Sequence, residues 1–99
     1  MAKYDVFPNP AGSGYLLDVQ TELLDYIDTR VVVPLLPVDQ APVPAKRLNP
    51  VFEIDGASMV LVTQSLASVP HHILRDPITN FSNDFAEITN ALDMVFQGF

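Results

Sequence analysis

Nine prolines interrupt this 99-residue sequence, and all of them lie within the first 77 residues. Proline lacks a backbone N–H and clashes with the preceding helical turn, so it breaks helices, whereas strand edges and strand ends tolerate it. The first four-fifths of the chain is therefore predicted to form short strands joined by turns. A helix is expected only after Phe81, where the prolines have stopped.

Six short segments of the proline-rich region are predicted to be strands, mainly from their β-branched or alternating apolar residues. They span residues 3–7, 15–19, 30–38, 51–54, 58–63 and 71–74. Asp55-Gly56 separates the fourth from the fifth and suits a type I′ hairpin turn, in which both central residues need positive φ. Pro34, inside the third, is expected at a bulge or an edge. Sequential antiparallel strands of this kind predict a small, curled sheet that is mainly β and barrel-like.

The apolar spacing changes from Ser82 onward and becomes that of a helix over residues 82–97. One apolar residue recurs every three or four positions and is expected to face the core: Phe85, Ile88, Leu92, Val95 and Phe99. Ser82 is expected to cap the first turn through its hydroxyl, and Gly98 to end the last one. The sequence therefore predicts a strand-rich body followed by one C-terminal helix.

The charge balance restricts the kind of partner that this chain can bind. Five Lys and Arg face twelve Asp and Glu, which gives a formal net charge of −7. Because binding to a phosphate backbone depends on Lys and Arg displacing counterions, direct nucleic-acid binding is not expected. A basic patch on a protein partner is a more natural target.

The sequence also indicates where the protein works. The chain has no Cys, which excludes disulfides and thiolate zinc sites. Its first ten residues hold no apolar run typical of a signal peptide, and its longest apolar run is too short to span a membrane. We therefore expect a cytoplasmic protein without membrane contact.

Candidate catalytic groups are few, and no cofactor is expected. His71 and His72 are adjacent in a predicted strand, where neighbours point to opposite faces, so they are not expected to hold a metal together. Asp25, Asp28 and Arg30 cluster around the end of residues 20–28, a stretch predicted to be a structured loop with at most one turn of helix. One hypothesis is acid–base cleavage of RNA with Arg30 on the phosphate. The other is a surface ion-pair group that pins the loop.

The last six residues, "MVFQGF", place two aromatic side chains and a glycine at the end of the predicted helix. Phe96 falls off the apolar stripe, because residues two apart do not share a helix face. One interpretation is that these residues only widen the core. The other is a protein-contact site, since aromatic side chains on a rigid support are typical of binding hot spots.

Several segments together resemble the CcdB family, the toxins of plasmid- and chromosome-borne toxin–antitoxin pairs. They are "YLLDVQTELLD", "RVVVPL", "VFEIDG", "MVLVTQSLASVP" and "MVFQGF", in the family's order and at nearly its spacing. The resemblance covers almost the whole chain. It implies a single domain over residues 1–99 with an SH3-like barrel, similar to that of the MazF/Kid family, followed by a C-terminal helix. It also implies a homodimer.

The same resemblance implies a function without catalysis by the toxin itself. CcdB toxins bind the dimerisation region of the A subunit of DNA gyrase and trap the enzyme on cleaved DNA, and a CcdA antitoxin neutralises them. By position, it implies gyrase contacts at Thr21, Leu23, Asp93, Phe96, Gln97, Gly98 and Phe99.

This sequence departs from the family at the helix end. Gln97 stands where the family has a Trp expected to stack on a gyrase Arg, and the family's Asn and Ser at two other contacts are Asp93 and Thr21 here. Phe96 or Phe99 could supply the missing ring. Two alternatives stay open: a MazF-like endoribonuclease toxin, and a CcdB homologue that keeps only the fold and antitoxin binding.

Overall fold

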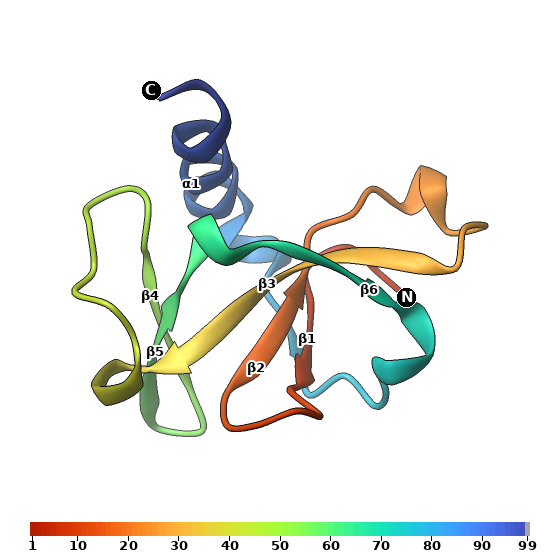
Figure 1. Ribbon diagram of the computed structural model, residues 1–99, viewed down its shortest axis with the longest axis horizontal. Helices are drawn as coiled ribbons and strands as arrows, with labels where there is room; N and C mark the ends of the chain where they lie inside the picture. Colours follow the sequence, from red (N-terminus) through yellow and green to blue (C-terminus); the bar gives the residue numbers. More distant parts are fainter. Residues whose placement is uncertain (99) are drawn as a thin grey trace.

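The computed structural model, which describes residues 1–98, shows a curled antiparallel sheet with a helix at its C-terminal end (Figure 1). The strands are β1 (Asp5–Pro8), β2 (Tyr15–Asp18), β3 (Thr29–Pro37), β4 (Val51–Ile54), β5 (Ala57–Leu61), β6 (Ala67–Pro70) and β7 (Thr79–Asn80). Single turns of 3-10 helix connect several of them: η1 (Glu22–Leu24), η2 (Val38–Gln40), η3 (Thr63–Ser65), η4 (His71–Ile73) and η5 (Ser82–Asp84). The α-helix, α1, spans Phe85–Gln97.

β3 is the central strand of the sheet. The strand order is β4-β5-β3-β2-β1-β7, and β6 pairs with β3 beside β5. Pro34 lies where the partner along one edge of β3 changes from β6 to β5. Its carbonyl accepts a hydrogen bond from the Val62 N–H at 2.9 Å on that side. The N–H and C=O of a strand residue point toward the same neighbouring strand. The N–H that proline lacks would therefore lie between the part of β3 that pairs with β6 and the part that pairs with β5, so neither ladder loses a hydrogen bond.

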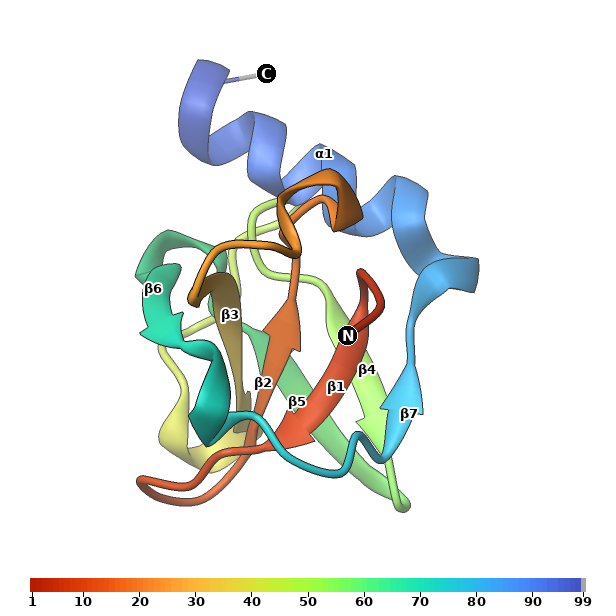
Figure 2. The same cartoon turned by 90° about the vertical axis from the view of Figure 1, so that its right-hand side faces the viewer.

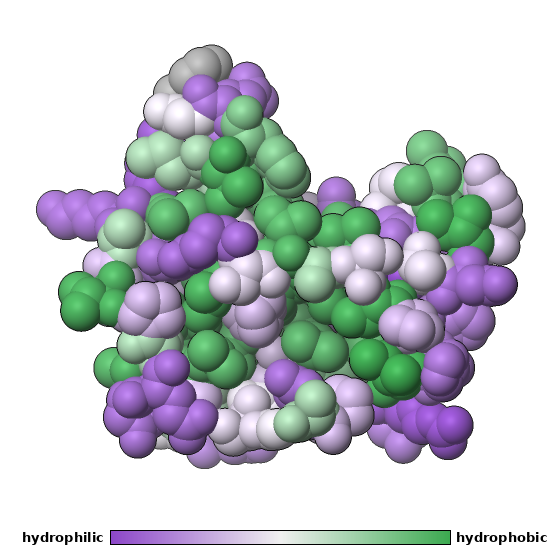
Figure 3. Space-filling model, in the orientation of Figure 1, coloured by the Kyte–Doolittle hydropathy of each residue, from purple (hydrophilic) through white to green (hydrophobic). Residues whose placement is uncertain are grey.

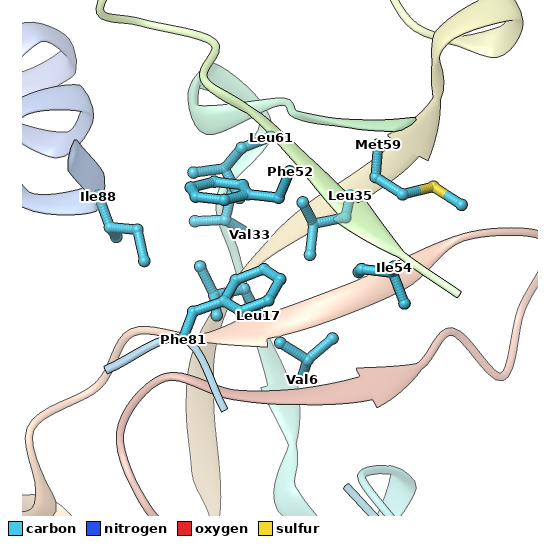
Figure 4. Packing of buried hydrophobic residues seen from close by; sticks show 10 residues of the cluster. All are labelled: Val6, Leu17, Val33, Leu35, Phe52, Ile54, Met59, Leu61, Phe81 and Ile88. Atoms are coloured by element: carbon cyan, nitrogen blue, oxygen red, sulfur yellow. The ribbon is translucent and has the colours of Figure 1, made fainter. Parts of the chain in front are cut away.

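The core lies inside the curl of the sheet, where ten buried apolar residues pack together (Figure 4). Phe52 of β4 and Phe81, just before η5, bring their ring centroids to 4.8 Å and so join the two ends of the sheet. Ile88 of α1, which is fully buried, reaches the same cluster. The architecture is thus a small SH3-like barrel with a C-terminal helix across one end (Figure 2), and the predicted fold class is confirmed.

The Asp55-Gly56 hairpin is also confirmed. Asp55 has φ 52° and Gly56 has φ 80°, and Ile54 pairs with Ala57 across the turn. Both central residues have the positive φ that the turn demands. Local turn chemistry alone was enough to place β4 against β5.

The expected strand over residues 71–74 is wrong. The strand is β6, which ends at Pro70, and His71–Ile73 form η4. Proline has no N–H with which to continue the ladder, so pairing with β3 stops there. Both His71 and His72 are exposed, although neighbours in the expected strand would have pointed to opposite faces. β7, at two residues, is too short to leave an apolar pattern in the sequence.

The start of the helix also differs from the expectation. Ser82 belongs to η5 and caps nothing with its hydroxyl; its N–H donates to Asn80 Oδ1 at 2.8 Å. The chain enters α1 through this tighter turn, which shifts the helical phase by comparison with an unbroken 3.6-residue period. Phe85, the first residue of α1, is 58% exposed, while Ile88 and Ala91 are fully buried.

The end of the helix follows the prediction. Gly98 adopts the left-handed conformation at φ 79°, and its N–H donates to the Met94 carbonyl at 3.1 Å. A glycine in this position satisfies a carbonyl of the last turn without steric cost. Phe99, which was expected on the inward stripe and in the partner contact, lies outside the described residues.

Candidate protein-contact site

The C-terminal turn of α1 presents the largest exposed aromatic surface of the helix. Phe96 is 68% exposed, Gln97 and Gly98 are also exposed, and Asp93 is half-buried. Figure 1 shows this end of the helix projecting away from the barrel. Phe96 therefore adds nothing to the core, and the interpretation in which it only widens the core does not hold.

The second predicted group lies in the loop that contains η1. Thr21 begins the turn, because its Oγ1 accepts from the Leu23 N–H at 3.3 Å. Leu23 is 85% exposed, and Tyr26, three residues further on, is 80% exposed. Two large apolar side chains thus face solvent within one short loop, which is unusual for residues with no partner.

The two groups lie on the same side of the molecule but on separate projections. In Figure 1, α1 and the η1 loop rise from the same side of the barrel, and Figure 3 shows a hollow between them with hydrophobic residues along it. The structure therefore places Thr21 and Leu23 apart from Phe96, Gln97 and Gly98. Within one chain they flank a concave surface and do not form one continuous patch.

A buried ion-pair network lies beneath the η1 loop. Arg30 is 2% exposed, and its Nη2 lies 2.7 Å from Oδ2 of Asp18, which is fully buried. Its Nε donates to the same oxygen at 2.9 Å, and its Nη1 pairs with Asp25 Oδ1. Burial raises the pKa of the Asp18 carboxyl, while the Gln20 N–H and the Arg30 guanidinium act in the opposite direction.

This network also bears on the RNA-cleavage hypothesis. Asp25, Arg30 and His71 line a pocket of about 360 Å³, so the structure brings His71 to a cluster with which it had not been grouped from the sequence. Two carboxylates already neutralise the Arg30 guanidinium, which leaves no net positive charge for a phosphate. Asp28 contributes its carbonyl, which accepts from the His71 N–H at 2.8 Å. The arrangement fits an ion-pair group that pins the loop.

His71, Asp18 and Gln20 were not placed in this cluster from the sequence. Their positions depend on the pairing of β3 with β2 and β6, which brings together segments that are distant along the chain. A polar residue ending an apolar strand, such as Asp18 in "YLLD", was the available signal. A buried carboxylate requires a charged or hydrogen-bonding partner, and Arg30 at the start of β3 was the nearest cation.

Comparison with models of known protein families shows which family the chain belongs to. Residues 3–98 match the model of the family described as CcdB protein. The chain belongs to the CcdB family. It is therefore a toxin of the toxin–antitoxin kind, and the family implies a toxin–antitoxin partnership.

Residues 1–98 contain no group of three or more His, Asp or Glu side chains arranged to bind a metal. In the same part of the chain, no helix is both long enough and apolar enough to cross a membrane.

Proposed function

We propose that this CcdB-family chain is a cytoplasmic homodimeric toxin that binds the A subunit of DNA gyrase and traps gyrase on cleaved DNA. It does so by contact and not by catalysis. A CcdA-like antitoxin neutralises it. The observation that carries the proposal is Phe96, a 68% exposed aromatic residue held at the end of a helix that Gly98 terminates.

The remaining features of the helix end support the same contact. Gly98 leaves open space around its Cα, with nothing within 4 Å of an added Cβ, so a partner can approach the backbone closely. Asp93 adds negative charge beside Phe96, which suits a basic surface on gyrase. In a twofold dimer two such helix ends belong to one symmetric platform, and the proposed contact is made there.

Gln97 is the residue that distinguishes this chain from the family pattern. Its amide offers hydrogen bonds but no ring on which an Arg can stack. Phe96 takes over that role in the proposal, because its ring is exposed one position away. Binding to gyrase is then expected to depend on Phe96 more strongly than on Gln97.

A cleavage-complex assay tests the proposal. The full chain, gyrase, ATP and supercoiled plasmid are incubated, and linear DNA is scored after denaturation. The full chain is expected to produce linear DNA, deletion of Gly98 and Phe99 to abolish it, and Phe96→Ala to lower the product about tenfold or more, the scale of a hot-spot residue. Phe85→Ala is the matched control, since Phe85 is an exposed aromatic residue at the other end of the same helix.

Equal loss of product in the two phenylalanine variants would contradict the proposed site. No linear DNA at any dose of a folded chain would overturn gyrase poisoning itself. The same preparation then distinguishes the alternatives. RNA cleavage that Arg30→Ala abolishes identifies an endoribonuclease, and tight antitoxin binding without either activity identifies a homologue that no longer kills.

A further inference from the structure

Leu23 is more exposed than any other leucine in the described chain, yet the loop that carries it is firmly held. Its side chain is 85% exposed, while Gln20 before it and Arg30 beneath it are 6% and 2% exposed. An exposed leucine gains nothing from folding. Buried polar side chains that support such a residue are typical of a binding element prepared for a partner.

Gln20 fastens the loop to the sheet through both ends of its side-chain amide. Its Oε1 accepts from the Val31 N–H of β3 at 3.0 Å, and its Nε2 donates to the Leu24 carbonyl at 3.3 Å. Its own N–H donates to Asp18 Oδ1 at 3.0 Å. One buried side chain therefore connects the end of η1 to the central strand.

Arg30 holds the same loop from two further points. Its Nη2 donates to the Gln20 carbonyl at 3.3 Å, and its Nη1 pairs with the Asp25 carboxylate. Residues 20 and 25 are thereby fixed on either side of η1, while Asp18 neutralises Arg30 from the β2 side. The contacts bracket Leu23 without touching its side chain.

We infer that Gln20 and Arg30 are positioning residues that present Leu23 to the A subunit of gyrase. The inference rests on the proposed function, and it adds two buried residues to the surface residues that make the contact. Fixing the loop during folding removes the entropy that ordering it would otherwise cost on binding. Gyrase then meets a leucine that is already in its bound position.

The test compares two buried amide residues that hold different loops. Gln20→Met keeps the length of the side chain and removes both of its hydrogen bonds. The control is Asn49→Leu, because Asn49 is 4% exposed and bonds Ala45 N at 3.1 Å and Leu61 O at 3.0 Å in a loop outside the proposed contact. Both variants lose stability, so a general effect of destabilisation appears in both.

Two measurements are made on the full chain and each variant. The first is affinity for the dimerisation region of the gyrase A subunit, which Gln20→Met is expected to weaken about tenfold and Asn49→Leu to leave within about twofold. The second is amide hydrogen exchange, expected to accelerate at residues 22–25 and at Val31, whose acceptor is removed, in Gln20→Met while the other β3 amides stay protected. A double-mutant cycle with Leu23→Ala should be non-additive, since Gln20 acts through Leu23.

The outcomes separate the inference from the function on which it rests. If the unaltered chain does not bind the A subunit of gyrase, the proposed function fails and the role of the loop in it fails as well. If it binds and the two variants lose affinity equally, or the cycle is additive, only the positioning role is overturned. Unchanged exchange at residues 22–25 in Gln20→Met would show that Gln20 does not hold the η1 loop in place, whether or not gyrase binds.

Discussion

At the scale of single residues, Gly14 shows how closely the turn between β1 and β2 approaches the central strand. Gly14 has φ +88°, and a Cβ added there would lie 2.2 Å from the Leu35 carbonyl oxygen. Its own carbonyl accepts from the Asn9 N–H at 3.1 Å, which closes the turn. Both the backbone conformation and the contact therefore require glycine.

Gly14→Ala should accordingly lower the free energy of unfolding by about 3 kcal/mol, because a clash of the new Cβ with the Leu35 backbone adds to an unfavourable φ. Urea denaturation measures the change. Gly12→Ala is the matched control in the same turn, since a Cβ there would meet nothing within 4 Å. It should alter stability by about 0.5 kcal/mol at most. Similar losses in both variants would mean that the turn is not held against β3 as described.

At the scale of elements, α1 shows where local pattern is reliable and where it is not. The apolar spacing correctly predicts a helix, and the chemistry of Gly98 correctly predicts its end. The pattern places Phe85 inward, but Phe85 is the first residue of α1 and is exposed, whereas Phe81, before the 3-10 turn η5, packs in the core. Ala91, a small residue that the stripe did not include, is fully buried instead.

The difference in burial predicts different effects at two apolar positions of α1. Ile88→Ala should lower the free energy of unfolding by about 3 kcal/mol, because the fully buried side chain leaves a cavity in the core. Phe85→Ala removes a larger side chain that is 58% exposed, and should cost no more than about 0.5 kcal/mol. Thermal or urea unfolding of the two variants decides the matter. A larger loss of stability in Phe85→Ala than in Ile88→Ala would mean that Phe85 faces the core, as the predicted stripe had it.

The strands that depend on a local turn were predicted correctly, whereas a strand that depends on long-range pairing was not. The β4–β5 hairpin was predictable because Asp55-Gly56 encodes its own turn. β6 was misplaced because Ala67 and Ser68 are small, exposed residues on an edge, and only their pairing with β3 makes them a strand. Sequence alone therefore predicted the fold class but not the edges of the sheet.

At the scale of the whole molecule, the sequence predicts some residues of the candidate site but not how the site is assembled. Phe96 and Leu23 could be predicted by resemblance, and both are exposed in the structure. The separation of their two projections, and the buried support from Gln20 and Arg30, depend on how the curled sheet brings distant segments together. Local patterns carry no information about such arrangements.

The net charge of −7 leads to a last prediction about the rate at which the proposed complex forms. If an acidic toxin meets a basic surface on gyrase, long-range attraction raises the association rate, and salt screens it. The association rate constant should fall about tenfold or more between roughly 50 and 500 mM salt, with a smaller change in the dissociation rate. Stopped-flow or surface-plasmon kinetics measure both rates.

Asp93→Asn should reduce this salt dependence more than Asp39→Asn does, although each variant removes one negative charge. The reason is position, because Asp93 lies beside Phe96 in the proposed contact, whereas Asp39 is an exposed residue of η2 outside it. Screened charges act over only about 8 to 10 Å at ordinary salt concentrations, so the acid nearest the partner has the largest effect. Equal effects of the two substitutions would show that the charge of the whole molecule steers association and that Asp93 at the helix end contributes no more than any other acidic residue.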